Sequence, residues 1–114
     1  MSNDIDKKCI ALIDTSKTKL VRVGLRMNTQ EIWSEEVVDI SGPQRVLPIL
    51  IRLLSAHKIT LHDLGSIEVH KGPGSFTGLR VGFAVANSLG YLLGISVNGS
   101  PVGQAALPVY ETGE

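Results

Sequence analysis

The sequence is poor in aromatic residues, and its charges cancel. Its 114 residues include one tryptophan, two tyrosines and two phenylalanines, and eleven basic side chains balance eleven acidic ones. A neutral chain without an aromatic platform lacks the electrostatic attraction and the stacking surface on which direct nucleic-acid binding depends. The lysines near the first turn, Lys7, Lys8, Lys17 and Lys19, are typical of a solvated strand end. We therefore expect this chain to contact nucleic acid only indirectly.

The single cysteine excludes a disulfide framework. Cys9 lies in the apolar run CIALID, which is typical of a buried strand. A lone buried thiol is usually an inert core residue, and such cysteine usage suits a reducing cytosol. The first residues, MSNDIDKK, carry acidic side chains and no apolar core. We therefore expect no signal peptide and a cytoplasmic protein.

No charged residue lies between Arg80 and Glu111, which raises the question of a membrane span. A spanning helix needs about 20 mainly apolar residues without a break. This stretch instead contains two prolines, and its glycines are spaced like turn markers, so a helix that begins near Gly78 would end near Gly94. The pattern predicts a buried helix followed by a short strand, and no membrane association.

The hydrophobic periodicity predicts one α/β domain over residues 1–114. The expected strands are 9–14, 19–26, 31–40, 66–70 and 95–99, and the expected helices are 45–58 and 78–93. Short connections between the first three strands imply an antiparallel meander, so the order is β-β-β-α-β-α-β in a mixed sheet. Pro48 is expected to bend or loosen the first turns of its helix. The tail from about residue 101 shows no clear pattern.

The segment GPGSFTG, residues 72–78, places three glycines between an expected strand and an expected helix. Such a loop can offer backbone N–H groups to an anion. The Walker signature requires a lysine and a hydroxyl residue after its last glycine, however, and here Gly78 is followed by leucine and arginine. Phosphate binding is therefore the less favoured interpretation. A hydroxyl of Ser75 or Thr77 that caps the helix explains the polar residues better than a hydrolase nucleophile does.

Small residues recur at every fourth position of the second helix. They are Gly78, Gly82, Ala86, Gly90 and Gly94, and on a helix they would lie in one row. A glycine inside a helix costs about 1 kcal/mol relative to alanine, so the row needs a packing explanation. Two explanations stay open. Either the helix approaches its own sheet closely, or the row forms a furrow that receives a helix of another chain.

Three segments resemble the TsaB family, also called YeaZ, whose members are accessory subunits in bacterial threonylcarbamoyl-adenosine synthesis on tRNA. The segments are IALIDTS, QRVLPILIRLL and EVHKGPGSFTGLRVG. They occur in the family's order and spacing, and the match covers about residues 8–100. The resemblance implies one lobe of the ASKHA fold, the RNase H-like fold of actin, Hsp70 and sugar kinases. Family members normally have a second lobe of comparable size, and nucleotide binds in the cleft between two such lobes.

The resemblance also implies a non-catalytic role. Family members bind a TsaD-type catalytic subunit through the two helices, support a TsaE-type ATPase in the same assembly, and self-associate through the helix pair. No cofactor is expected, because ATP and magnesium would enter only in the assembled complex. Transferred to this sequence, the partner-binding residues are expected to be Leu47, Leu50, Leu54, Gly78, Gly82, Phe83, Ala86 and Gly90.

The sequence departs from the family's pattern at two places. Gly42 and Pro43 stand where a histidine and a small hydroxyl residue are usual, and Glu68 and His70 stand where small or apolar residues are usual. These departures leave the expected fold unchanged and alter details of the partner surface.

An ATP-binding enzyme of the ASKHA type is the alternative interpretation. In related nucleotide-binding proteins the first hairpin holds phosphate, and here it supplies Asp14, Thr15 and Ser16 beside the GPGSFTG turn. No glycine lies in that hairpin turn to admit a phosphate, and an aspartate at a strand end is well suited to cap a turn. The three histidines share no spacing typical of metal ligands, so no metal site is expected. A regulatory homodimer unrelated to tRNA is a third, weaker hypothesis.

Overall fold

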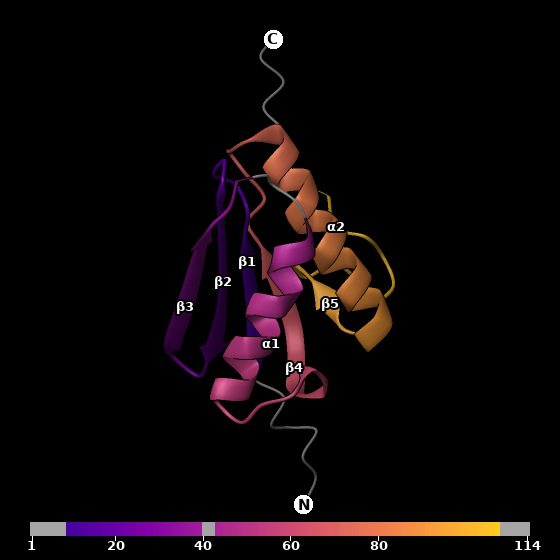
Figure 1. Ribbon diagram of the computed structural model, residues 1–114. Helices are drawn as coiled ribbons and strands as arrows, with labels where there is room; N and C mark the ends of the chain where they lie inside the picture. The colour runs from indigo at the N-terminus through magenta and orange to yellow at the C-terminus, as the bar shows by residue number, and fades with distance from the viewer. Residues whose placement is uncertain (1–8, 40–42, 108–114) are drawn as a thin grey trace, which may run out of the picture.

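The computed structural model describes residues 9–39 and 43–107, which form a five-stranded sheet and two α-helices (Figure 1). The strands are β1 Cys9–Asp14, β2 Leu20–Met27, β3 Gln30–Val37, β4 Leu64–Val69 and β5 Ser96–Val97. The helices are α1 Val46–Ala56 and α2 Phe76–Leu93. The order along the chain confirms the predicted β-β-β-α-β-α-β arrangement.

The sheet is mixed and has the strand order β3-β2-β1-β4-β5. β1 pairs antiparallel with β2, and β2 pairs antiparallel with β3, which is the predicted meander. β4 pairs parallel with β1, and β5 pairs parallel with β4, because a helix returns the chain before each of these strands. β1 therefore lies at the centre of the sheet, and its C-terminal end leads into the turn that carries Asp14, Thr15 and Ser16.

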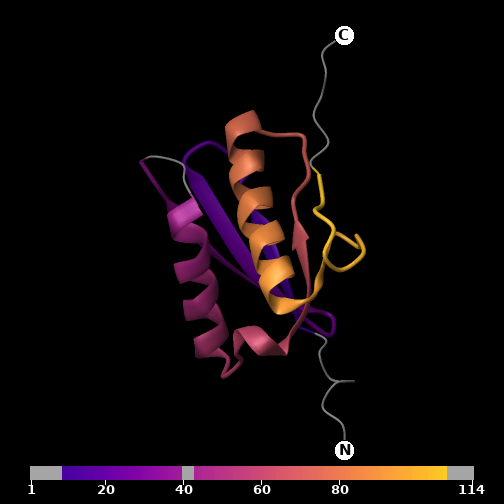
Figure 2. The same cartoon turned by 90° about the vertical axis from the view of Figure 1, so that its right-hand side faces the viewer.

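Both helices cover one face of the sheet, and no described element covers the other, which we call the open face (Figures 1 and 2). Alternate residues of β1, β2 and β4 point towards the helices, as the period of two in a strand requires. The core residues with the lowest exposure on these strands are Ala11, Ile13, Val23, Leu25, Leu64 and Ile67. From α1, the buried residues are Val46, Ile49, Leu50 and Leu54. The core therefore lies between the sheet and the two helices.

The bounds of four strands differ from the sequence predictions, although β2 is displaced by only one residue, to Leu20–Met27. β3 ends at Val37, although a strand up to residue 40 was expected, and residue 40 lies outside the described residues. β4 begins at Leu64 and so is longer at its N-terminal end. β5 has two residues where five were expected. It ends there because Asn98 adopts φ +51°, outside the extended range, and the side chain of Asn98 then bonds the N–H and C=O of Val69, at 2.8 and 3.0 Å.

Pro48 does not interrupt α1, which corrects the expectation that it bends or loosens the helix. A 3₁₀ turn, Pro43–Arg45, leads into α1, and Pro48 is the third residue of the helix. The N–H groups of a helix's first turn have no acceptor within the helix, so a proline there loses no hydrogen bond. Gly42, the other residue expected at this entry, lies outside the described residues.

The beginning of the tail packs against α2. The side chain of Asn87 accepts a hydrogen bond from the N–H of Ala106 at 2.8 Å and donates one to its C=O at 3.0 Å. Ala106 is consequently buried in the core. The rest of the tail, residues 108–114, lies outside the described residues. Neither described helix is long and apolar enough to cross a membrane.

Candidate protein-interaction surface

The glycine-rich loop packs directly against the turn between β1 and β2. The N–H of Ser75 donates to the C=O of Ser16 at 2.7 Å, and the hydroxyl of Thr15 donates to the C=O of Gly78. A Cβ atom added at Gly74 would lie 2.5 Å from the Cβ of Ser16, and one added at Gly78 would overlap the carbonyl oxygen of Thr15. These two glycines therefore allow two backbone segments to approach each other, which is a structural role.

Asp14 caps this turn, in agreement with the interpretation favoured from the sequence. Its Oδ1 accepts hydrogen bonds from the backbone N–H and the hydroxyl of Ser16, at 3.0 and 2.6 Å. Its Oδ2 lies 3.5 Å from Nη1 of Arg22. Burial raises the pKa of Asp14, but the hydrogen bonds from Ser16 and the charges of His70 and Arg22 outweigh burial, so the pKa lies below its ordinary value. Asp14 is therefore an ionised carboxylate that the fold itself uses.

The structure brings the three expected nucleotide-binding residues together at one turn. Thr15 and Ser16 are buried, and their hydroxyls donate within the chain. Nucleotide binding by Asp14, Thr15 and Ser16 stays a prediction of the sequence.

Ser75 caps α2, which confirms one of the two capping residues expected. The N–H of Gly78 donates to the Ser75 hydroxyl oxygen at 3.1 Å, and the helix begins at Phe76. At the other end Gly94 adopts φ +69°, a left-handed conformation that glycine reaches without strain. The start of α2 is therefore two residues earlier than expected, and its end agrees with the prediction.

The row of small residues on α2 faces the protein's own sheet. A Cβ atom at Gly82 would lie 2.5 Å from Oγ1 of Thr15, and one at Gly90 would lie 2.6 Å from a methyl carbon of Val97. Ala86, between them, is fully buried. The same chain therefore occupies the space along this row as far as Gly90, and only beside Gly94, where the helix ends, is the space open. This corrects the expectation of an open furrow for another helix and supports the other explanation, close approach to the sheet.

Most of the residues expected to bind a partner are buried in this structure. They are Leu50, Leu54, Gly78, Gly82, Phe83, Ala86 and Gly90. Leu47 is the exposed member of the set, with 39% of its surface accessible. The three-and-four spacing of the others indicates the face that packs on the sheet. A partner that docks on this structure would meet the opposite face of the helices.

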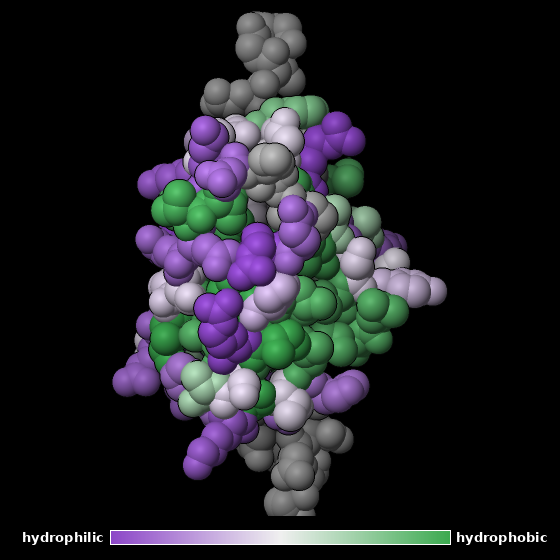
Figure 3. Space-filling view, in the orientation of Figure 1, coloured by the Kyte–Doolittle hydropathy of each residue, from purple (hydrophilic) through white to green (hydrophobic). Residues whose placement is uncertain are grey.

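Exposed apolar side chains on that opposite face form the candidate interaction surface. On α1, Leu47 and Ile51 line a shallow groove of about 820 Å³ with Pro48. On α2, Tyr91 and Leu92 have 75% and 76% of their surface exposed. Figure 3 shows hydrophobic side chains gathered over α1 and the C-terminal half of α2. We define these five residues as the outer helical face.

Sequence reasoning missed four of these five residues, although α1 carried a signal for two of them, Pro48 and Ile51. The only polar side chains of α1 are Arg52 and Ser55. A helix that packs one face on a sheet needs an apolar stripe and normally shows polar residues elsewhere. The apolar residues of α1 exceed that requirement, and the surplus side chains are the exposed ones.

The open face of the sheet is charged, and its arginines are paired. Arg22 bonds Glu35 at 2.8 Å, and Arg26 bridges Glu31 and Glu68, at 2.9 and 3.0 Å. These ion pairs join β2 to β3 on one side and reach across β1 to β4 on the other. Glu68, a departure from the family's pattern, therefore has a structural partner on this face.

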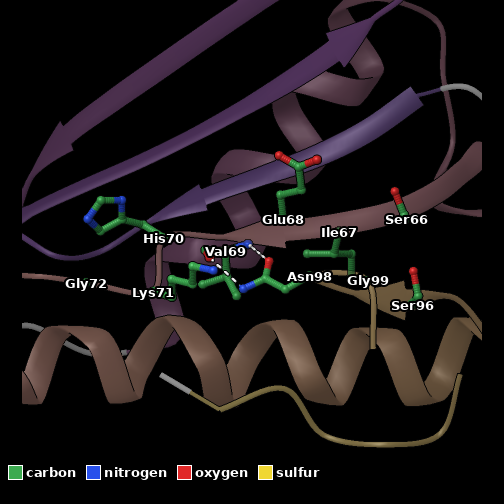
Figure 4. A pocket seen from close by; sticks show the side chains of 10 residues that line it. All are labelled: Ser66, Ile67, Glu68, Val69, His70, Lys71, Gly72, Ser96, Asn98 and Gly99. Atoms are coloured by element: carbon green, nitrogen blue, oxygen red, sulfur yellow. Dashed lines mark hydrogen bonds between the residues drawn. The ribbon is translucent and has the colours of Figure 1, made fainter. Parts of the chain in front are cut away.

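A hollow of about 590 Å³ lies along β4 and β5 (Figure 4). Ser66, Glu68 and Ser96 point away from α2 in this view, and the Asn98 amide is turned towards Val69. Glu68 and Asn98 already make the hydrogen bonds described above. Within residues 9–39 and 43–107, no three side chains are grouped so that they could hold a metal ion.

The single thiol lies in the core. Cys9 is buried, and burial together with the charge of Asp63 raises its pKa above the ordinary value. The thiol is therefore protonated at neutral pH, which agrees with the expectation of an inert core residue.

Comparisons with known proteins agree with this architecture. The family described as "TsaD: tRNA N6-adenosine threonylcarbamoyltransferase" matches residues 41–101. Among curated proteins, the tRNA threonylcarbamoyladenosine biosynthesis protein TsaB of Buchnera aphidicola is 42% identical over 55 residues, which are 48% of this chain and 26% of that protein. The protein of the same name from Haemophilus influenzae is 28% identical over 103 residues, which are 87% of this chain and 43% of that protein.

A solved structure shows the same fold. YeaZ from Pseudomonas aeruginosa superposes with a TM-score of 0.72 and 28% identity, over 82% of this chain and 44% of that chain. The mixed sheet with both helices on one face is thus an α/β lobe of the ASKHA type, as expected from the sequence. The chain belongs to the TsaB/YeaZ family. It spans less than half the length of these relatives.

Proposed function

We propose that this chain is a non-catalytic scaffold in the biosynthesis of threonylcarbamoyladenosine on tRNA, and that it docks a TsaD-type catalytic subunit through the outer helical face. Membership of the family supports the pathway, because relatives from two organisms bear the name of the biosynthesis protein TsaB. The expectations of a TsaE-type ATPase in the same assembly, of an indirect contact with tRNA and of a cytoplasmic location belong to this proposal. So does the expectation of a homodimer in isolation.

The exposed apolar residues of α1 carry the proposal. Leu47 and Ile51 each keep about two-fifths of their surface accessible, next to Pro48 in the same groove. Gathered apolar surface of this kind marks interaction sites on soluble proteins. Removal of such apolar surface from water contributes about 25 cal/mol of favourable free energy per Å² buried. The opposite side of α1 is fixed in the core, so these side chains are presented from a rigid support.

The polar groups on the other side of the molecule support a scaffold rather than an enzyme. Asp14 holds Ser16 and lies beside Arg22, and Glu68 holds Arg26. A carboxylate that is already held by an arginine or a turn has fewer oxygen lone pairs left to accept from a substrate. These two carboxylates instead stabilise the turn and the sheet.

Two substitutions test the docking face. Ile51→Glu and Leu92→Glu each place a charge on an exposed apolar position, so both variants should fold. We expect each to weaken binding to the TsaD-type subunit of the same organism by about tenfold or more, because the charge would lose water without gaining a partner. The measurement is isothermal titration calorimetry with the two purified proteins.

Val37→Glu is the matched control. Val37 is 81% exposed and lies on β3, so the chemical change is the same on an element outside the outer helical face. Its affinity should equal that of the unmodified chain. Retention of full affinity by both Ile51→Glu and Leu92→Glu, with unchanged circular dichroism, would exclude this face as the docking site.

A further inference from the structure

We propose that Asn98 is a site of spontaneous covalent modification, at which deamidation of its side chain releases β5 from β4. The amide of Asn98 joins the two strands in the folded chain, and the backbone nitrogen of Gly99 is placed to convert that amide into a carboxylate. The proposal concerns the edge of the sheet and does not depend on where a partner docks.

Asn98 is the only asparagine of the sequence that is followed by glycine. The others are Asn3, Asn28 and Asn87, and they precede aspartate, threonine and serine. Deamidation begins when the backbone nitrogen of the next residue attacks the carbonyl carbon of the asparagine side chain. A side chain on that next residue hinders the attack, and glycine has none. The sequence therefore singles out Asn98 for this chemistry.

The backbone nitrogen of Gly99 is accessible. Asn98 and Gly99 are the central residues of a β-turn, in which the N–H of Ser100 donates to the C=O of Val97 at 3.0 Å. Their φ angles are +51° and +77°, and positive φ at both central residues defines the type I′ turn that Asn-Gly favours. Gly99 is exposed, and within residues 9–39 and 43–107 no group accepts a hydrogen bond from its N–H. The attacking nitrogen is therefore at the surface and unpaired in the described part of the chain.

The side chain that would be attacked is held by β4. Its Oδ1 accepts a hydrogen bond from the N–H of Val69 at 2.8 Å, and its Nδ2 donates one to the C=O of Val69 at 3.0 Å (Figure 4). The backbone N–H of Asn98 donates to the C=O of Ile67 at 2.9 Å. Because β5 itself has only two residues, the hydrogen bonds of Asn98 form a large share of its connection to β4.

The hydrogen bonds with Val69 slow the reaction in the folded chain. The attack turns the planar amide into a tetrahedral centre, which is incompatible with both bonds to Val69, so the edge of the sheet must first open locally. Such openings are easiest where few contacts hold an element. Asn98 and Gly99 also line the hollow of about 590 Å³ beside β4 and β5, which admits water. The rate is therefore the rate in an open chain multiplied by the fraction of time that this edge is open.

The reaction consumes only water. A bond forms between the Gly99 nitrogen, which loses its proton, and the side-chain carbonyl carbon of Asn98, and the bond from that carbon to Nδ2 breaks with release of ammonia. Water then opens the five-membered imide at one of its two carbonyls. The products are aspartate and its isomer, in which the main chain runs through the side-chain carboxyl carbon. Nothing is oxidised or reduced.

Both products lose part of the connection to β4. A carboxylate still accepts from the N–H of Val69, but it has no N–H to donate to the C=O of Val69, so two acceptors face each other. The isomer in addition lengthens the main chain within the turn between Val97 and Ser100. We therefore expect β5 to loosen from β4 after the reaction. The change is one-way, because the ammonia has left.

Ageing of the purified chain tests the site. The chain is kept in mildly alkaline buffer at one temperature, with and without urea, and its peptides are analysed by mass spectrometry with fragmentation that distinguishes aspartate from its isomer. We expect both products at Asn98, with Asn28 and Asn87 as internal controls that react far more slowly. The reaction in urea should be about tenfold or more faster, because the folded chain must first open. Absence of product at Asn98, or equal rates with and without urea, would overturn the proposal.

A variant that loosens β5 tests the dependence on local opening. Val97→Ala shortens a buried side chain of β5, and Val23→Ala makes the same change on β2, away from this edge. We expect deamidation at Asn98 to be about threefold or more faster in Val97→Ala and nearly unchanged in Val23→Ala. Circular dichroism establishes that both variants are folded. Equal rates in the two folded variants would contradict the role of the edge.

The last experiment measures the consequence of the reaction. Asn98→Asp reproduces the product that keeps the normal main chain, and Asn28→Asp makes the same change in the exposed turn between β2 and β3. Hydrogen exchange of the peptide that contains β5 should be faster in Asn98→Asp than in the unmodified chain, and unchanged in Asn28→Asp. If exchange of that peptide is the same in all three proteins, deamidation does not release β5.

Discussion

The hydroxyl of Thr15 donates a hydrogen bond to the carbonyl oxygen of Gly78, across a sequence separation of 63 residues. This bond joins the turn after β1 to the first turn of α2. The same two residues touch through their backbones, because the space beside the Gly78 Cα is filled by the carbonyl of Thr15. The glycine-rich segment that first suggested a phosphate site is therefore where the helix meets the central strand.

Substitution of Gly78 by a residue with a side chain should destabilise the fold. In Gly78→Ala the new methyl group would overlap the Thr15 carbonyl, and the backbone would have to shift. We expect the free energy of unfolding to fall by about 2 kcal/mol or more, as for other overpacked core positions. Urea denaturation followed by circular dichroism measures it. Thr77→Ala, at the exposed preceding residue, should change stability by less than about 0.5 kcal/mol. Equal stability of the two variants would show that the close contact is not required.

The carboxylate of Asp14 should make stability depend on pH in the acid range. Its pKa is lower in the folded chain than its ordinary value of 3.8, so its contribution is complete above that pH and is lost as pH falls through the folded pKa. Asp14→Asn should therefore destabilise the chain at pH 7, by about 1 kcal/mol for a weakened charged hydrogen bond. The difference between the two proteins should shrink towards pH 3. A difference that is constant from pH 7 to pH 3 would mean that the charge is not what stabilises the turn.

The side chain of Asn87 should hold the segment before residue 108 against α2. Asn87→Ala removes both hydrogen bonds to Ala106 and leaves a backbone donor and acceptor without them. We expect a loss of about 1–2 kcal/mol in stability and faster hydrogen exchange at the Ala106 amide. Mass spectrometry of exchanged peptides measures this. Ser88→Ala, at the exposed neighbouring position, should leave the exchange unchanged, and the idea fails if the two variants behave alike.

The only tryptophan of the sequence reports on the open face of the sheet. The ring of Trp33 lies across Gly24, and the guanidinium carbon of Arg22 is 4.3 Å from the ring centroid. A Cβ at Gly24 would be 2.8 Å from a ring carbon, so Gly24→Val should displace the indole into water. We expect a red-shifted fluorescence emission and a stability loss of about 1–3 kcal/mol. Thr18→Val, in the exposed turn before β2, should leave the emission maximum in place.

Large substitutions in the row of small residues on α2 would test the core rather than an interface. Gly82→Leu and Ala86→Trp insert large side chains at buried positions that face the sheet. Such changes would disturb folding and binding together, so they cannot identify an interface. Substitutions at Ile51 and Leu92 avoid this difficulty because these side chains are exposed.

The sequence predicted the fold well where the signal was local. The periodicity of β1 and β2 and the spacing in both helices gave the element order, and the three quoted motifs gave the family. β5 was predicted too long because its pairing with β4 is continued by one side-chain amide, Asn98, which no periodicity reveals. Docking through α1 and α2 stays a prediction, and the structure places most of the residues named for it on the face that packs against the sheet.

The order of strands and helices, a hydroxyl cap at Ser75 or Thr77 and the helix end at Gly94 were determined by the sequence alone, because each depends on residues a few positions apart. Which side of α1 and α2 meets the sheet was decided only by the tertiary structure. Both helices have apolar residues on more than one side, so local periodicity leaves the choice open. Contacts such as those of Thr15 with Gly78 and Gly82 settle it, because they fix α2 on the sheet from a distant part of the chain. Once that side is buried, Ile51 and Leu92 are left exposed on the outer helical face.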